Sequence, residues 1–128
     1  MATDKKSVRV VTGVVIHGDK RGRELGYPTA NIALTNVTDL EFGVYAARVL
    51  ARPAAVSVGV RPTFGDGLVP LLEAHILDFA GSLYGWEIEV ELIERLRPEL
   101  RFDSVEELLA QMERDIADVR RRVPSRGA

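Results

Sequence analysis

Two short polar side chains, Thr29 and Asn31, follow Pro28 in a segment with the character of an extended strand. Because they are two residues apart, both side chains would face the same side of the chain. Each presents a neutral oxygen of the kind that Mg²⁺ accepts beside water and substrate phosphates. A neutral pair is a weak metal site alone, so phosphate oxygens would have to complete it. The alternative is that both residues make turn and cap hydrogen bonds.

The segment just before them, residues 18–26, combines three glycines with three cations. The residues concerned are Gly18, Gly22, Gly26, Lys20, Arg21 and Arg23. Glycines let backbone N–H groups converge on an anion, and neighbouring cations strengthen contacts to phosphate oxygens. The spacing is not that of a Walker A loop. The segment therefore predicts either a phosphate-binding loop or a polar hairpin loop.

A carboxylate, Glu73, lies within a largely apolar strand predicted over residues 71–79. Strand alternation puts Glu73 and His75 on one face and Leu72 and Ala74 on the other. If the carboxyl were desolvated, its pKa would rise and it could act as a general base. Alternatively, Glu73 simply faces solvent. His75 could be a neighbour that supports Glu73, or a structural histidine held by a hydrogen bond.

A fourth candidate is the run from Leu96 to Phe102, which contains Arg97, Pro98 and Arg101. Two guanidinium groups and an aromatic ring around a proline could border a planar ligand, or could be a solvated loop. Aromatic residues elsewhere in the chain also fall in or beside predicted loops, which is weakly typical of a rim around a flat ligand. They are Tyr27, Phe64, Tyr84 and Phe102.

Composition excludes several other chemistries. The 128 residues contain no cysteine and two histidines, which rules out disulfides, thiolate metal sites and multi-histidine zinc sites. Seventeen basic and nineteen acidic residues give a net charge of −2, which argues against a general nucleic-acid binder. The interrupted apolar runs are too short to span a bilayer, and the N-terminus lacks a signal-peptide pattern. We therefore expect a cytoplasmic protein with no membrane association.

Periodicity predicts the elements that must position these side chains. Apolar and β-branched alternation indicates six strands, with residues 17–28, 35–42 and 61–70 as loops. The predicted strands cover residues 8–16, 29–34, 43–50, 55–60, 71–79 and 86–92. Gly13 within the first strand predicts a bulge or a close approach. In the last strand Trp86 should face the core with Ile88, opposite an acidic, solvent-facing side.

The C-terminal segment has a different period. Apolar residues at helical spacing predict an amphipathic helix over about 104–122, with Ser104 and Glu107 as a capping box and Pro124 beyond its end. Strands that follow one another without intervening helices favour an antiparallel sheet closed into a small barrel. The helix should then pack on the barrel or plug one end.

The run at residues 22–31, G-R-E-L-G-Y-P-T-A-N, resembles the G-R-x-L-G-[FY]-P-T-A-N signature of riboflavin kinases. Further segments match that family in order over about residues 8–122. They are G-V-Y-A at 43–46, S-V-G-V-R-P-T at 57–63, L-E-A-H at 72–75, D-F at 78–79, L-Y-G at 83–85, L-R-P-E at 96–99 and F-D-S at 102–104.

The resemblance implies a mainly β fold, a six-stranded antiparallel Greek-key barrel with a C-terminal helix. It implies transfer of a phosphoryl group from ATP to riboflavin, giving FMN and ADP, with Mg²⁺, or Zn²⁺ in some members. Thr29 and Asn31 would then bind the metal and phosphates, and Glu73 would be the base. Other positions would contact the substrates. These are Gly18, Arg23, Pro28 and Tyr84 toward the nucleotide, and Arg97 and Phe102 toward the flavin.

The expected organisation is a single riboflavin kinase-like domain over residues 1–128. Many bacterial members carry an FMN adenylyltransferase module ahead of this domain, but 128 residues leave no room for one, so FAD synthesis is not expected. The expected partners are riboflavin and ATP, without nucleic acid or an obligate protein partner. The alternative function is a non-catalytic flavin- or nucleotide-binding barrel.

Overall fold

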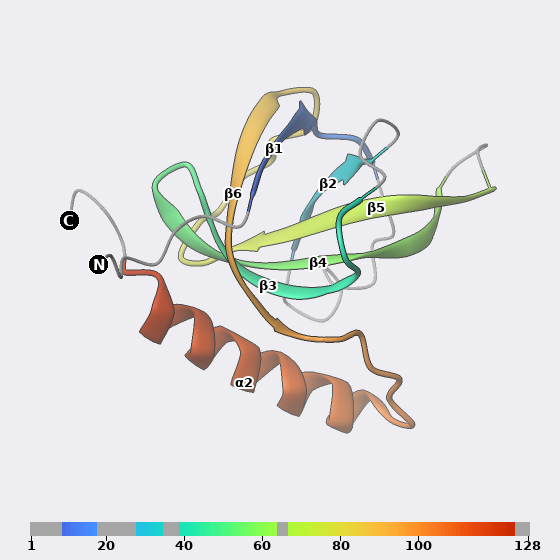
Figure 1. Cartoon of the computed structure of the whole chain (residues 1–128), viewed down its shortest axis with the longest axis vertical. Helices are drawn as coiled ribbons and strands as arrows, with labels where there is room; N and C mark the ends of the chain where they lie inside the picture. Colours follow the sequence, from blue (N-terminus) through green and yellow to red (C-terminus); the bar gives the residue numbers. More distant parts are fainter. Residues whose placement is uncertain (1–8, 18–27, 35–38, 64–66, 125–128) are drawn as a thin grey trace.

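The structure, a computed structural model, describes residues 9–17, 28–34, 39–63 and 67–124. This part of the chain contains six strands and one long helix (Figure 1). In chain order they are β1 (Arg9–Val14), β2 (Ala30–Ala33), β3 (Gly43–Val49), β4 (Arg52–Thr63), β5 (Gly67–Ile76), β6 (Glu87–Arg97) and α2 (Val105–Arg122).

The six strands form one antiparallel sheet in the order β1-β6-β3-β4-β5-β2. Strands β3, β4 and β5 follow one another as hairpins, and β6 returns to pair with β3, which is a Greek-key arrangement. The two edge strands approach each other at a bridge between Ile16 and Asn31, where the Ile16 N–H donates to the Asn31 carbonyl at 2.8 Å. The sheet is therefore a nearly closed barrel, as the sequence predicted.

The barrel interior is filled by alternate residues of every strand, among them Val11, Val56, Leu72 and Val90, all buried. Their neighbours in sequence face outward, including the exposed Glu87 and Glu89 on β6. This confirms the solvent-facing acidic side of the last strand. The alternation matters for function because Asn31 and Glu73 belong to the outward set.

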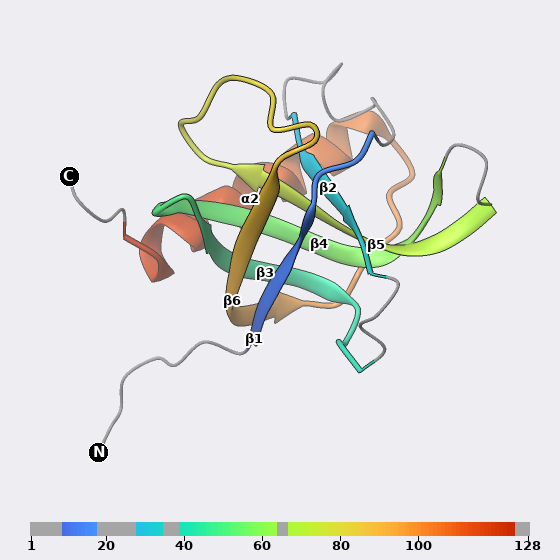
Figure 2. The ribbon, with the colours of Figure 1, turned by 90° about the horizontal axis from the view of Figure 1, so that it is seen from above.

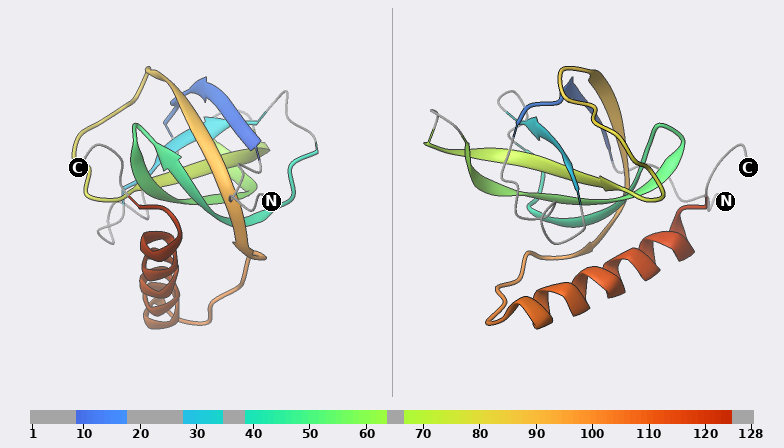
Figure 3. Two further views of the ribbon diagram at one scale, coloured as in Figure 1. Left: turned by 60° about the vertical axis from the view of Figure 1, so that its left-hand side comes forward. Right: turned by 180° about the vertical axis from the view of Figure 1, so that it is seen from behind.

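Helix α2 lies outside the barrel, along its outer surface (Figure 3). Val119 and Val123 are fully buried against Ala46 and Leu77 of the barrel. The Ser104 hydroxyl accepts a hydrogen bond from the Glu107 N–H at 3.1 Å, which confirms the predicted cap. Of the two predicted placements, the helix therefore packs on the barrel wall and does not plug an end.

Gly13 marks a close approach between the edge strands. A Cβ atom at this position would lie 2.4 Å from the Ile32 Cγ2 atom. Only a glycine lets β1 come this near to β2, so the second of the two predicted explanations is correct.

Several sequence predictions were wrong. The strand predicted over 71–79 ends at Ile76, and the strand predicted over 86–92 continues to Arg97. Residues 61–70 are not a loop: β4 continues to Thr63 and β5 begins at Gly67, and the pair projects from the barrel (Figure 2). Pro62 is tolerated because β3 pairs with β4 only up to Val58, and Pro70 because β2 pairs with β5 only from Leu71 onward, so each proline has an open strand side. Trp86 is 63% exposed rather than buried, because it precedes β6 in the connection from β5.

Within the described residues, the one helix of sufficient length is too polar to cross a membrane.

Candidate active site

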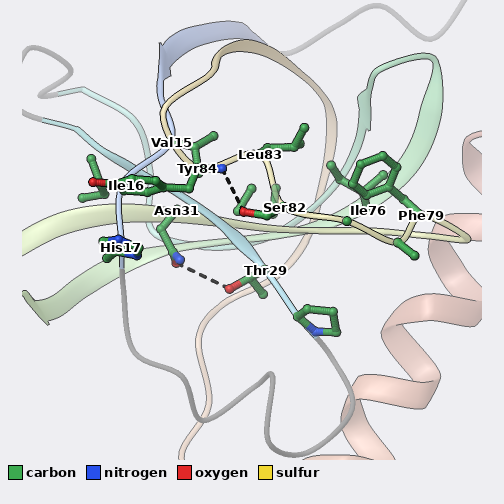
Figure 4. Close-up of a pocket in the computed structure, with 15 residues that line it drawn as sticks. Val15, Ile16, His17, Thr29, Asn31, Ile76, Phe79, Ser82, Leu83 and Tyr84 are labelled. Atoms are coloured by element: carbon green, nitrogen blue, oxygen red, sulfur yellow. Dashed lines mark hydrogen bonds between the residues drawn. The ribbon is translucent and has the colours of Figure 1, made fainter.

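A pocket of about 530 Å³ opens where the two edge strands meet (Figure 4). Its walls come from the segment that follows β1, the start of β2, the end of β5 and the connection between β5 and β6. The lining residues are Val15, Ile16, His17, Pro28, Thr29, Ala30, Asn31, Ala74, Ile76, Phe79, Ala80, Gly81, Ser82, Leu83 and Tyr84. Four of the residues predicted from the sequence are thus brought together here: Pro28, Thr29, Asn31 and Tyr84.

Thr29 and Asn31 both line the pocket, and the Thr29 hydroxyl donates to the Asn31 Oδ1 atom at 3.5 Å (Figure 4). Asn31 is only 5% exposed, so its side chain is held by the surrounding structure. Two neutral oxygens this close together fit a hard cation that takes further oxygens from a bound phosphate. Among the described residues, no cluster of three or more acidic or histidine side chains could hold a metal instead.

Glu73 lies directly opposite Asn31 in the pairing of β2 with β5. On its other side, Ser57 of β4 is its register partner. Residues opposite each other in an antiparallel sheet point to the same face, with Cβ atoms about 4.5–5.5 Å apart. The half-buried Glu73 is therefore beside the Thr29–Asn31 pair, on the outer face of the barrel.

His75, on the same strand, contacts Pro28, which lines the pocket just before β2. Its Nδ1 atom is 3.0 Å from the carbonyl oxygen of Pro28. This confirms the interpretation of His75 as a hydrogen-bonded histidine and identifies its partner, which the sequence alone could not do.

One wall of the pocket is aromatic. The rings of His17 and Tyr84 are stacked, with centroids 3.7 Å apart and planes inclined by 15° (Figure 4). The Tyr84 N–H donates to the Ser82 hydroxyl at 3.3 Å, which helps to shape the turn that carries the ring. Sequence reasoning missed His17, because a lone histidine after a strand has no local signal. Its partner comes from a distant part of the chain.

The connection that carries Phe79 and Tyr84 is tied to helix α2. Both oxygens of Asp78 accept hydrogen bonds from Arg120, at 2.9 and 3.1 Å. The Arg120 guanidinium holds the pKa of the Asp78 carboxyl below its usual range through this hydrogen bond. Arg52 also donates to the Asp78 carbonyl at 2.7 Å and lies over the Phe79 ring. The helix thus steadies one wall of the pocket.

The remaining predicted residues lie elsewhere. Arg97, at the end of β6, forms a two-pronged ion pair with Asp115 of α2, at 2.9 and 2.7 Å. Phe102 follows in the connection to the helix, and neither residue lines the pocket. Gly18 and Arg23 lie outside the described residues.

A barrel with a phosphate-compatible pocket and an adjacent carboxylate is an arrangement suited to phosphoryl transfer. Residues 6–123 match the protein family described as riboflavin kinase. The chain belongs to this riboflavin kinase family.

Individual relatives agree with the family match. The chain is 44% identical over 110 residues to the bifunctional riboflavin kinase/FMN adenylyltransferase of Escherichia coli K12, covering 82% of this chain and 35% of that protein. It is 36% identical over 117 residues to the RNA-binding riboflavin kinase RibR of Bacillus subtilis, covering 88% of this chain and 50% of the relative. The chain therefore spans about a third of the bifunctional relative and half of RibR.

Among solved structures, the riboflavin kinase of Trypanosoma brucei superposes with a TM-score of 0.65 at 22% identity. The superposition covers 88% of this chain and 77% of that one. At this identity the likeness establishes the fold alone, a six-stranded barrel with a C-terminal helix.

Proposed function

We propose that this chain transfers the γ-phosphoryl group of ATP to the ribityl 5′-hydroxyl of riboflavin, giving FMN and ADP. The observation that carries the proposal is the cross-strand pairing of Asn31 with Glu73 beside the pocket. It puts an oxygen ligand for a metal–phosphate group and a candidate base on one face of two neighbouring strands. Membership of the riboflavin kinase family supports the choice of substrates.

The proposed division of labour follows the geometry. The pocket takes the nucleotide, with the His17–Tyr84 stack as a flat wall and Thr29 and Asn31 at its phosphate end. Gly18 and Arg23 are proposed as further phosphate contacts from the preceding glycine-rich segment. Arg97 and Phe102 are proposed to border the flavin at the other end of the outer face.

Glu73 is the proposed general base. The ionised carboxylate accepts the proton of the ribityl 5′-hydroxyl while the hydroxyl oxygen forms its bond to the γ-phosphorus. The bond between that phosphorus and the bridging oxygen breaks, and ADP leaves with the electron pair. Reactions of this kind depend mainly on alignment, which the barrel wall would supply, and on charge neutralisation, which a bound metal would supply.

A divalent metal held by Thr29 and Asn31 would neutralise charge on the phosphates. We propose Mg²⁺, because two neutral oxygens completed by phosphate and water suit a hard cation. Zn²⁺, which generally takes nitrogen, sulfur or carboxylate ligands, is the second candidate.

Residues 1–128 are proposed to form one riboflavin kinase domain acting on soluble metabolites in the cytoplasm. The alternative is a barrel that binds flavin or nucleotide without turnover.

The test is direct conversion. Purified protein incubated with riboflavin, ATP and Mg²⁺ should yield FMN and ADP in equal amounts. The products are separated by chromatography, and FMN is detected by flavin fluorescence and ADP by the ultraviolet absorbance of adenine. Parallel reactions with Zn²⁺ and with a chelator establish the metal requirement. Binding of either substrate without FMN formation under any metal would favour the non-catalytic alternative.

A further inference from the structure

We propose that His75 is a positioning residue that holds Thr29 in place for the metal–nucleotide complex, acting through the carbonyl group of Pro28. This inference rests on the proposed function, since it concerns the same pocket. It assigns to His75 a task distinct from that of Glu73, two residues earlier on the same face of β5.

The hydrogen bond requires a proton on one particular ring nitrogen of His75. The Pro28 carbonyl oxygen can only accept, so the His75 Nδ1 atom, 3.0 Å away, must carry the proton and donate it. Both the neutral Nδ1–H tautomer and the doubly protonated ring have this donor. The contact therefore does not depend on a change in the charge of His75.

The hydrogen bond from His75 holds a segment that the backbone pairing of β2 with β5 does not reach. The pairing of β2 with β5 begins at Ala30 opposite Ala74, so Pro28 and Thr29 precede the first paired residue. Pro28 has no N–H with which to extend the ladder. Continuing the register by one residue would put Thr29 opposite His75. The histidine side chain thus ties down the stretch that the ladder does not reach.

The Pro28 carbonyl is an effective point of attachment for Thr29. It belongs to the planar peptide unit that ends at the Thr29 nitrogen and Cα atoms. Holding the oxygen fixes that plane, and with it the direction in which the Thr29 side chain leaves the backbone. Thr29 is half-buried beside Asn31, and metal ligation tolerates little displacement, because Mg²⁺ requires oxygens at about 2.0–2.1 Å.

Two substitutions of similar shape separate the hydrogen bond from packing. His75→Leu removes the donor, while His75→Asn supplies an amide N–H close to the position of Nδ1. Tyr45→Phe is the matched control. It also deletes one hydrogen bond from a side chain to a backbone carbonyl, that of Glu41, but Tyr45 lies in the barrel core and does not line the pocket.

Binding is measured by calorimetry with a non-hydrolysable ATP analogue, once with Mg²⁺ and once with a chelator, and turnover is measured separately. His75→Leu should weaken Mg²⁺-dependent nucleotide binding about three- to tenfold, the range expected for the loss of one positioning hydrogen bond. Nucleotide affinity in the presence of chelator and the KM for riboflavin should each change less than about twofold. This is less than the loss of one hydrogen bond would cause. His75→Asn should recover most of the loss, and Tyr45→Phe should behave as the wild type.

The proposal is overturned if His75→Asn binds as weakly as His75→Leu, or if binding with and without metal declines equally. It is also overturned if the KM values for nucleotide and riboflavin rise together. If His75→Leu fails to fold, His75→Ala takes its place, because alanine also lacks the donor and should lose metal-dependent binding that His75→Asn keeps. Calorimetry needs no turnover, so a wild type that binds Mg²⁺ and nucleotide but makes no FMN would refute the proposed reaction and leave the role of His75 testable.

Discussion

Glu73 illustrates what a single residue can and cannot reveal before a fold is known. Strand alternation alone puts it on the face opposite the core, where a glutamate could simply be solvated. The register adds that Asn31 is its neighbour on one side and Ser57 on the other. A carboxylate beside an oxygen pair that suits a metal has a chemical use that an isolated glutamate on a strand does not.

Replacing Glu73 by Gln should therefore separate binding from turnover. The amide keeps the size and polarity of the carboxyl but cannot accept the proton of the 5′-hydroxyl. We expect kcat for FMN formation to decrease by about 10²–10⁴, the usual contribution of a general base, with substrate affinities changed only a few-fold.

Steady-state FMN production measures this effect, and Glu89→Gln on the exposed face of β6 is the control. A Glu73→Gln variant that turns over like the Glu89→Gln control would remove Glu73 from the role of base.

Other residues of the site could not be found from the sequence. The motifs and the family resemblance pointed to Thr29, Asn31 and Tyr84, which all line the pocket. His17 and the bond from His75 to Pro28 depend on contacts between segments far apart in the chain. Such pairs are set by how the strands are ordered in the sheet, and local patterns carry no information about them.

At the level of elements, helix α2 was the most predictable part of the molecule. Its apolar spacing, its Ser104 cap and its end near Pro124 are all local signals, and the structure confirms them. The β4–β5 hairpin was the least predictable. Its prolines and glycines are typical of a loop, but the outer sides of β4 and β5 are unpaired beyond Val58 and before Leu71, and an open strand side tolerates residues that a central strand would not.

The attachment of α2 to the barrel depends on a pair that no local signal predicts, Arg97 with Asp115. Asp115 is 6% exposed and also accepts a hydrogen bond from Gln111 at 3.0 Å. Asp115→Ala should leave the Arg97 guanidinium without its carboxylate in a largely buried place. The free energy of unfolding should decrease by about 3 kcal/mol, the low end for a broken buried pair.

Urea unfolding measures this loss. The matched control on the same helix is Asp118→Ala, which removes an exposed ion pair with Arg121 and should cost less than about 1 kcal/mol. Equal midpoints for the two variants would show that the Arg97–Asp115 pair does not stabilise the docking of the helix.

For the molecule as a whole, the decisive feature is the line along which β1 approaches β2. Apolar alternation was enough to predict a barrel. It did not predict where the two edges of the sheet would meet, or that they would meet at a single bridge among the described residues. Gly13 is the residue that makes the approach possible, because a side chain there would meet Ile32.

Gly13→Ala should therefore overpack this line. We expect a loss of about 1–3 kcal/mol in the free energy of unfolding, as for other additions of a methyl group to a filled space. Adding Ile32→Leu, which moves the branch away from the Cβ atom, should recover part of that loss.

The measurement is again urea unfolding, of the two single variants and the double variant. If Gly13→Ala proved as stable as the wild type, or if Ile32→Leu lowered its stability further, the close approach would not limit closure of the barrel.

Asn31 has two roles on this line: its carbonyl accepts the bond that joins the edge strands, and its side chain faces the pocket. A ligand that immobilises the side chain must also restrain the carbonyl of the same residue. Part of the free energy of ligand binding therefore stabilises the bridge between Ile16 and Asn31, which joins the two edges of the sheet. By this linkage, a bound ligand should stabilise the hydrogen bond between Ile16 and Asn31, and loss of that hydrogen bond should weaken ligand binding.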